Sequence, residues 1–251
     1  MNIVGTFFWL PEKKPVGRID LLHACAGQLM DNKESWPEDG ELGIDGFEYG
    51  ALAGADTPKS AKERLRWLRL QPDKPFKPQP YEQLAKVLRG MGHEKDAREA
   101  LIAKHRDLRK HGEIGRFSKI GNFILDKTIA YGWNQWLVFL YIIPLLLLGW
   151  GAFCYADKNL NVIQPSKEGV FMSEEFKEKG VIPSAYPVFN SFIYSLDTFV
   201  PFVDLHQENY WLPDASKERG RFFRWYLWVH IALGWVFSTL AAVGFTGLVR
   251  K

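Results

Sequence analysis

Cysteine is scarce in this chain of 251 residues, with only Cys25 and Cys154 present. Cys25 lies in a polar region and Cys154 ends an apolar segment, and neither belongs to a metal-binding or redox spacing, so we expect no disulfide framework. The histidines are scattered without metal-ligand spacing. The P-loop, GxGxxG, GxSxG and CxxC motifs are also absent. We therefore predict no catalytic, metal-binding or cofactor-binding residues, and an enzyme is the least supported class of function.

A large charge imbalance is also lacking, since 32 Lys and Arg stand against 29 Asp and Glu, a net charge of +3. This excess is too small and too dispersed to indicate a nucleic-acid partner. The N-terminus has no basic stretch followed by an apolar run, so we expect no secretory signal before the first long apolar segment.

Charge is absent altogether from two long segments, 133–155 and 225–249. A hydrocarbon core about 30 Å thick requires roughly 20 apolar residues in a helix, and both segments meet that length. Each has Trp and Tyr near an end, where such rings can lie at the level of the lipid headgroups. Buried helices of a soluble core are the alternative. We predict two transmembrane helices in an α+β protein with about half of its mass in water.

The distribution of basic residues predicts an orientation for these helices. Between residues 104 and 127 there are seven Lys and Arg against three acids, and the chain closes on Arg250-Lys251. The positive-inside rule then places both termini in the cytoplasm and the loop 156–224 outside, as in a multi-pass protein of the bacterial inner membrane. An opposing group of basic residues precedes the second predicted span: Lys217, Arg219, Arg221 and Arg224.

Residues 1–57 are expected to be rich in β-structure. Short alternating segments are separated by breaks rich in Pro and Gly. A recurring pattern of Gly followed by spaced apolar residues suggests the rungs of a β-solenoid. Since about three rungs bury little core without neighbours, a short hairpin sheet is an equally good interpretation.

Residues 58–112 are predicted to contain a cytosolic helical hairpin. The segment from Pro80 to Gly92 has an apolar face, and the segment that follows ends at Gly112. Two helices joined by a tight turn containing Gly form an αα-hairpin. The pair either has a structural role or provides a docking surface for an unknown cytosolic protein.

Residues 113–132 are predicted to form an interfacial amphipathic helix. Its apolar face is formed by Phe117, Ile120, Phe123 and Ile124. The other sides carry basic residues that we assign to the lipid interface: Arg116, Lys119 and Lys127. Such a helix would lie at the headgroup boundary of an anionic bilayer.

The outer loop contains a short apolar helix, predicted at 188–200 and ended by Pro201. A span, a short helix and a second span are the layout of a two-helix pore subunit. The stretch 200–203 contains no glycine, however, which argues against a potassium-selective filter. The residues assigned to a possible pore or re-entrant element are Ser195, Asp197, Thr198 and Asp204, together with His230 inside the second span.

Small residues recur along the second predicted span at Gly234, Ser238 and Ala242. This spacing indicates a face for close helix packing. We expect the chain to form a homo-oligomer.

Several sequence blocks together resemble a known family. They are G-T-F-F-W (5–9), G-x-I-D-L (17–21), S-W-P (35–37), L-x-I-D-G-F-x-Y (42–49), R-L-x-W-L (64–68), P-Q-P-Y-E-Q-L-A-x-V-L-R-x-x-G (78–92) and F-x-x-x-x-Y-S-L-D-T-F-x-P (189–201). The succession is similar to the C-terminal half of a bacterial membrane-protein family of uncharacterised function, whose members begin with pentapeptide-like β-solenoid rungs. The resemblance implies that 1–56 is the end of a solenoid and that this chain is a shortened member. Some members are labelled membrane-associated oxidoreductases, but this sequence has no cofactor motif and we do not carry that label over.

Two functions follow as hypotheses. The first is an integral inner-membrane scaffold or sensor that presents a cytosolic module for binding a protein partner. The alternative is a homo-oligomeric two-helix pore.

Overall fold

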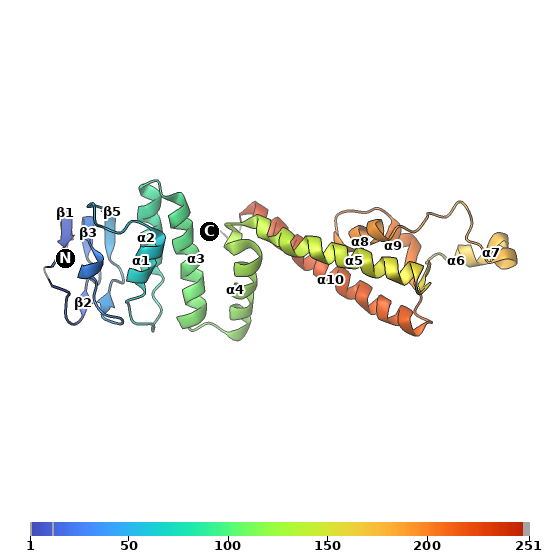
Figure 1. The fold of residues 1–251 in the computed structure, drawn as a ribbon, viewed down its shortest axis with the longest axis horizontal. Helices are drawn as coiled ribbons and strands as arrows, with labels where there is room; N and C mark the ends of the chain where they lie inside the picture. Colours follow the sequence, from blue (N-terminus) through green and yellow to red (C-terminus); the bar gives the residue numbers. More distant parts are fainter. Residues whose placement is uncertain (1, 12, 248–251) are drawn as a thin grey trace. The chain divides into compact units, whose positions relative to one another are not determined.

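The computed structural model describes residues 2–11 and 13–247, and the chain divides into two compact units, Met1–Lys127 and Thr128–Lys251 (Figure 1). The protein is a mixed α+β structure that is mostly helical and has small parallel sheets. The general prediction of an α+β fold is confirmed at this level. The last residues of the second predicted span, 248–249, and Arg250-Lys251 lie outside the described residues.

The first unit begins with two small parallel sheets. One has the strand order β1-β3-β5 and the other pairs β2 with β4. The bounds are β1 Asn2–Trp9, β2 Ile19–Asp20, β3 Cys25–Asp31, β4 Leu42–Gly43 and β5 Glu48–Leu52. Each strand passes to its parallel partner through a connection that contains other elements, rather than through a tight turn.

The prediction of a small sheet within residues 1–57 is confirmed, but the hairpin pairing and the solenoid need correction. A hairpin sheet is wrong because every described pairing in this region is parallel. A solenoid is wrong because the strands form two small sheets and the chain then leaves them for helices. The physical reason is burial: so few strands cannot enclose a core alone, and helices supply the missing apolar surface.

Four helices complete the first unit: α1 Ala61–Leu68, α2 Gln79–Gly90, α3 Glu94–His111 and α4 Arg116–Ile129, the last of which runs two residues past the unit boundary. The side chain of Ser60 caps α1 by accepting a hydrogen bond from the Glu63 amide. Pro80 lies in the first turn of α2, where its missing N–H leaves no helical hydrogen bond unmade. A short turn joins α2 to α3, as expected of the helical hairpin.

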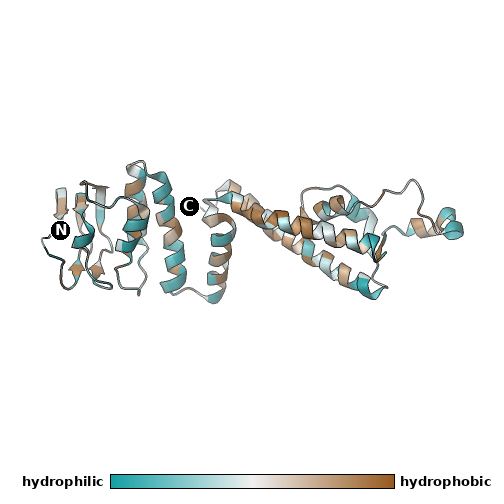
Figure 2. Ribbon diagram, in the orientation of Figure 1, coloured by the Kyte–Doolittle hydropathy of each residue, from teal (hydrophilic) through white to brown (hydrophobic). Residues whose placement is uncertain are grey.

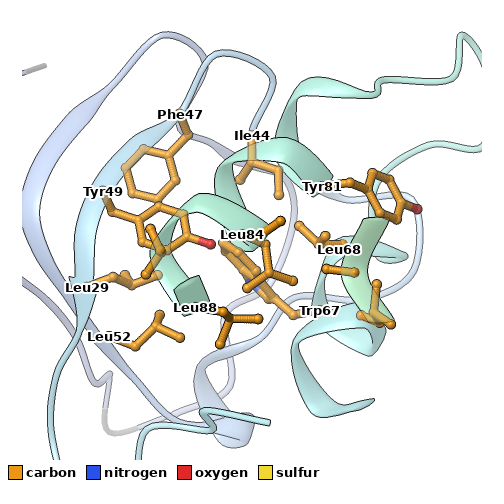
Figure 3. Packing of buried hydrophobic residues seen from close by; sticks show 14 of the residues in the cluster. Leu29, Ile44, Phe47, Tyr49, Leu52, Trp67, Leu68, Tyr81, Leu84 and Leu88 are labelled. Atoms are coloured by element: carbon orange, nitrogen blue, oxygen red, sulfur yellow. The ribbon is translucent and has the colours of Figure 1, made fainter. Parts of the chain in front are cut away.

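The core of the first unit lies between the sheets and the first helices. Leu29 and Leu52 from the strands meet Leu84 and Leu88 from α2, and Trp67 of α1 lies beside them (Figure 3). All five side chains are buried. Burial of a large apolar side chain stabilises a fold by about 1.5–3 kcal/mol.

A buried ion pair crosses this core. Arg64 of α1 donates to both carboxylate oxygens of Asp31 at the end of β3, and its Nε donates to the carbonyl of Pro58 at 2.7 Å. The Trp36 indole N–H donates to the same carboxylate at 2.9 Å. The exposed fractions of the Arg64 and Asp31 side chains are 0% and 3%. Because neither charge contacts water, removing one of them would leave the other buried and unpaired, which is strongly unfavourable.

Two long helices form the frame of the second unit, α5 Phe139–Lys158 and α10 Glu218–Thr246. They differ from the predicted spans at both ends, because α5 starts six residues later than 133 and α10 starts seven residues earlier than 225. Charged residues such as Glu218 and Arg221 are good helix formers, so the helix extends beyond the apolar segment. Each helix is long and apolar enough to cross a membrane by length and composition.

Shorter elements connect these helices to each other and to α4. They are η2 Ala130–Gly132, η3 Gln135–Val138, β6 Ile163–Pro165, α6 Glu168–Met172, α7 Glu174–Lys179, α8 Ser191–Phe199, α9 Gln207–Tyr210 and β7 Trp211–Pro213. Strands β6 and β7 pair antiparallel and join the two ends of the loop, a link that the sequence analysis did not predict.

Candidate functional site

Helix α8 is the structural form of the predicted short helix at 188–200. Its N-terminus is set by Asn190, whose side-chain oxygen accepts hydrogen bonds from the amides of Phe192 and Ile193 at 3.1 Å. It ends at Phe199, two residues before Pro201, which cannot continue a helix without breaking its hydrogen bonds. The helix packs against both α5 and α10. It is therefore an internal element of the second unit.

The structure brings together two of the predicted pore residues, Ser195 and His230. The Ser195 hydroxyl donates to the carbonyl of Leu146 on α5 at 3.0 Å. The Nε2 atom of His230 on α10 lies 3.2 Å from both the hydroxyl and the carbonyl oxygen of Ser195. The two residues are 1% and 2% exposed. This cluster links α5, α8 and α10 through polar contacts in an apolar surrounding.

The hydrogen-bond pattern determines what this Ser–His pair can do. A nucleophilic serine needs a neighbouring base that accepts its proton. Here the hydroxyl of Ser195 donates its proton to the carbonyl of Leu146. The carbonyl of Ser195 can only accept a hydrogen bond, so Nε2 of His230 carries a proton and donates it to that carbonyl. The imidazole is enclosed by Phe153, Phe199 and Tyr226. This geometry suits a structural contact that holds α5, α8 and α10 together better than it suits a catalytic dyad or a pore lining.

Of the other residues of the predicted pore element, Thr198 adjoins this cluster, whereas Asp197 and Asp204 are separate from it. Asp197 is buried and accepts hydrogen bonds from the amides of Leu205 and Glu208, which fixes the loop after α8. The Thr198 hydroxyl donates back to the carbonyls of Tyr194 and Ser195 within α8, at 2.7 and 3.3 Å. Asp204 is exposed and pairs with its neighbour His206. These contacts are local and structural, and they do not converge on a passage.

Small residues allow the three helices to approach closely. A Cβ atom at Gly234 would lie 1.9 Å from the carbonyl oxygen of Phe199, and one at Gly149 would lie 2.4 Å from Ser195 and His230. Ser238 is buried on the same side of α10 as Gly234. Ala242, in contrast, is exposed. The predicted packing face therefore includes Gly234 and Ser238 inside the unit, and Ala242 lies beside it.

The predicted lipid-interface residues all lie on α4. Arg116 and Lys127 are exposed and Lys119 is half-buried. Asp126, seven residues after Lys119, lies on the same side of the helix as Lys119. Its buried carboxylate accepts hydrogen bonds from Arg106 and Arg109 of α3.

Charge pairing controls the titration of Asp126. Burial alone would raise its pKa, but the hydrogen bonds from the two guanidinium groups outweigh burial and lower the pKa below the usual value of a carboxyl group. The contribution of these ion pairs to stability is complete above the ordinary carboxyl pKa and is lost as the pH falls through the lowered pKa.

The first unit has a cavity of about 590 Å³ beside the starts of β3 and β5. Its lining residues include Cys25, Glu48 and Lys86. These groups do not form a nucleophile–base pair of the kind that covalent catalysis requires. Among residues 2–11 and 13–247, no group of three or more His, Cys, Asp or Glu side chains could hold a metal ion.

One surface was missed in the sequence analysis. Phe8 on β1 is 65% exposed, while its neighbours Phe7 and Trp9 pack against the core. Leu10 and Val16 in the following segment are also exposed. The alternation of side chains along a strand could have predicted that Phe8 points away from the core.

Comparisons with protein-family models, curated proteins and solved structures found no match to this chain.

Proposed function

We propose that the chain is a two-span membrane protein that acts as a scaffold or sensor and presents its first unit to a protein partner. The observation that carries this proposal is the exposure of the apolar side chains on α5 and α10. In the most apolar window of each candidate span, only 22% and 28% of the residues are buried. A core helix of a soluble protein would be mostly buried.

The exposed side chains on these helices are large and apolar. Figure 2 shows apolar residues along the length of α5 and α10. The exposed residues include Leu140, Ile143, Leu147, Leu148, Trp228, Val229, Trp235 and Val236. Apolar surface of this extent is unfavourable in water and suits contact with lipid chains. At about 1.5 Å per residue, α5 would cover roughly 30 Å, the thickness of a hydrocarbon core.

The internal polar groups support the same conclusion. A charged or polar group inside a bilayer must be paired, because no water is present to satisfy it. His230 and Ser195 bond to each other and to the backbone, so α10 carries no exposed ionisable side chain along its apolar part. The basic residues before α5 favour a cytoplasmic first unit in a bacterial inner membrane.

The partner surface that we propose is the open edge of β1. This strand pairs only with β3 among the described strands, so its other edge offers unpaired backbone groups. A shallow cavity of about 330 Å³ beside it is lined by Phe8, Trp9, Leu10, Pro11 and Pro15. An extended segment of a partner can add to such an edge, with affinity from main-chain hydrogen bonds and from pockets for side chains.

Site-specific photo-crosslinking tests this function. A benzoyl-phenylalanine at position 8 of the full chain, activated in intact cells, is expected to give discrete adducts with one protein. The matched control carries the same group at Glu99, an exposed position on α3. If positions 8 and 99 gave the same adducts, the crosslinks would result from random collision and not from a specific partner surface at β1. No adduct from position 8, or turnover of a metabolite by the purified chain alone, would contradict a scaffold.

A further inference from the structure

Helix α4 has two faces with different chemistry. Phe117 is 91% exposed and Ile120 is 57% exposed on one side. Phe123, 51% exposed, lies between this side and α3, where the Arg109 guanidinium is 5.4 Å from its ring centre. The other side carries Asn122 and Asp126, which are bonded to α3. At about 100° per residue, Asp126 lies roughly opposite Phe117 on the helix.

The contacts with α3 fix the direction of the apolar face. The Asp126 carboxylate is held by Arg106 and Arg109, and Asn122 both accepts from Arg109 and donates to the carbonyl of His105. If α4 rolled about its axis to bury Phe117 against α3, the buried carboxylate would lose both guanidinium groups. Breaking a buried pair is strongly unfavourable, so the apolar face stays directed outward.

The charges around this face identify what covers it. Arg116 stands at the start of the helix and Lys127 near its end, whereas Lys119 lies on the side of Asp126, which faces α3. The Lys127 ammonium lies 5.9 Å from the centre of the Phe123 ring, so charge and apolar surface are adjacent. An apolar stripe bordered by cations is complementary to a bilayer with anionic headgroups.

The position of α4 in the chain supports the same occupant. The helix ends at Ile129, and the first candidate span begins at Gln135. Six residues reach at most about 22 Å even when fully extended. If α5 crosses a membrane, the end of α4 must therefore lie close to its surface.

We infer that α4 lies in the headgroup layer of an anionic bilayer, with Phe117 and Ile120 at the boundary of the acyl chains. This inference rests on the proposed membrane anchoring and adds the lipid class and the depth of one helix. It also gives the first unit a fixed attachment to the membrane surface, because α4 is bonded to α3.

Spin-label accessibility measures this depth directly. The full chain, with Cys25 and Cys154 replaced by alanine, is reconstituted in nanodiscs of phosphatidylglycerol or of phosphatidylcholine. Labels are attached at Phe117→Cys, Ile120→Cys, Ser118→Cys and Leu147→Cys. Ser118 is exposed and lies about 100° from Phe117, so it is the matched control, and Leu147 on α5 reports insertion of the span.

In phosphatidylglycerol, the labels at 117 and 120 are expected to collide more with oxygen than with a water-soluble nickel chelate, and the label at 118 is expected to show the reverse. Replacing Arg116 or Lys127 by glutamine should lower the equilibrium constant for immersion about fivefold. Immersion should also weaken in phosphatidylcholine.

Two outcomes would overturn the inference. Labels at 117 and 120 that remain in water while the label at 147 is in lipid would exclude it and leave the anchoring intact. Immobile labels that neither reagent reaches would show that protein covers the face. A label at 147 in water would instead contradict the proposed membrane anchoring.

Discussion

Replacing Asp31 with alanine is expected to destabilise the first unit by about 3–5 kcal/mol, the typical effect of breaking a buried ion pair. The variant leaves Arg64 without its carboxylate in a fully buried position, and the Trp36 indole loses its acceptor. Hydrogen exchange of the β3 and α1 amides in the full chain measures the change in the free energy of opening.

The matched control is Glu38→Ala, which removes an exposed pair with Lys14 whose side chains are 76% and 58% exposed. An exposed pair contributes about 0–1 kcal/mol, so this variant should be close to the unaltered chain. If the free energy of opening of the Asp31→Ala variant also lay within about 1 kcal/mol of the value for the unaltered chain, the ion pair would not hold the sheet to α1.

Gly234→Ala is expected to destabilise the second unit, although alanine is normally the better helix former by about 1 kcal/mol. The added methyl group would lie 1.9 Å from the Phe199 carbonyl, a backbone atom that cannot rotate away. Overpacking of this kind typically costs about 1–3 kcal/mol. Thermal denaturation in detergent should show a melting temperature several degrees lower.

Gly151→Ala on α5 separates the packing effect from helix propensity. A Cβ atom there meets no atom within 4 Å, so this variant should be as stable as the unaltered chain or more stable. Equal melting temperatures for the two variants would contradict the close approach of α8 and α10.

Local patterns were sufficient to predict the long helices and α8, but not the short helices α6, α7 and α9 of the outer loop. The apolar segments, the helical hairpin and the short helix before Pro201 all have signals within a few residues of themselves. The predicted limits were less accurate where a helix extends past its apolar part, as α10 does from Glu218. The limits of α8 depend on Asn190 and Pro201, whose roles as cap and stop are readable from sequence.

The pairing of strands could not be predicted in the same way. Register in a parallel sheet depends on contacts between distant segments, such as Asn2 with Cys25 and Cys25 with Glu48. The antiparallel link between Ile163 and Pro213 likewise closes across most of the outer loop. Alternation along one strand does not specify its neighbour.

The structure brings Ser195 and His230, two of the predicted pore residues, into contact with each other. Ser195 was selected as part of a possible pore or re-entrant element, and His230 as an ionisable group inside a predicted span. Their roles depend on the carbonyl of Leu146, a backbone atom on a third helix. The buried pair of Asp31 and Arg64 was missed because charged residues in a polar region are usually exposed.

We propose that α5 and α10 cross a membrane with the first unit on the cytoplasmic side. Ala55 and Ala185 are both exposed and lie in the first unit and in the loop between α7 and α8. Single Ala55→Cys and Ala185→Cys variants, in a background without Cys25 and Cys154, are treated in intact cells with a membrane-impermeant maleimide. We predict labelling at 185 in intact cells and labelling at 55 only after the membrane is opened. Labelling at 55 and not at 185 would invert the orientation, and identical labelling of both positions before and after opening would contradict the two spans.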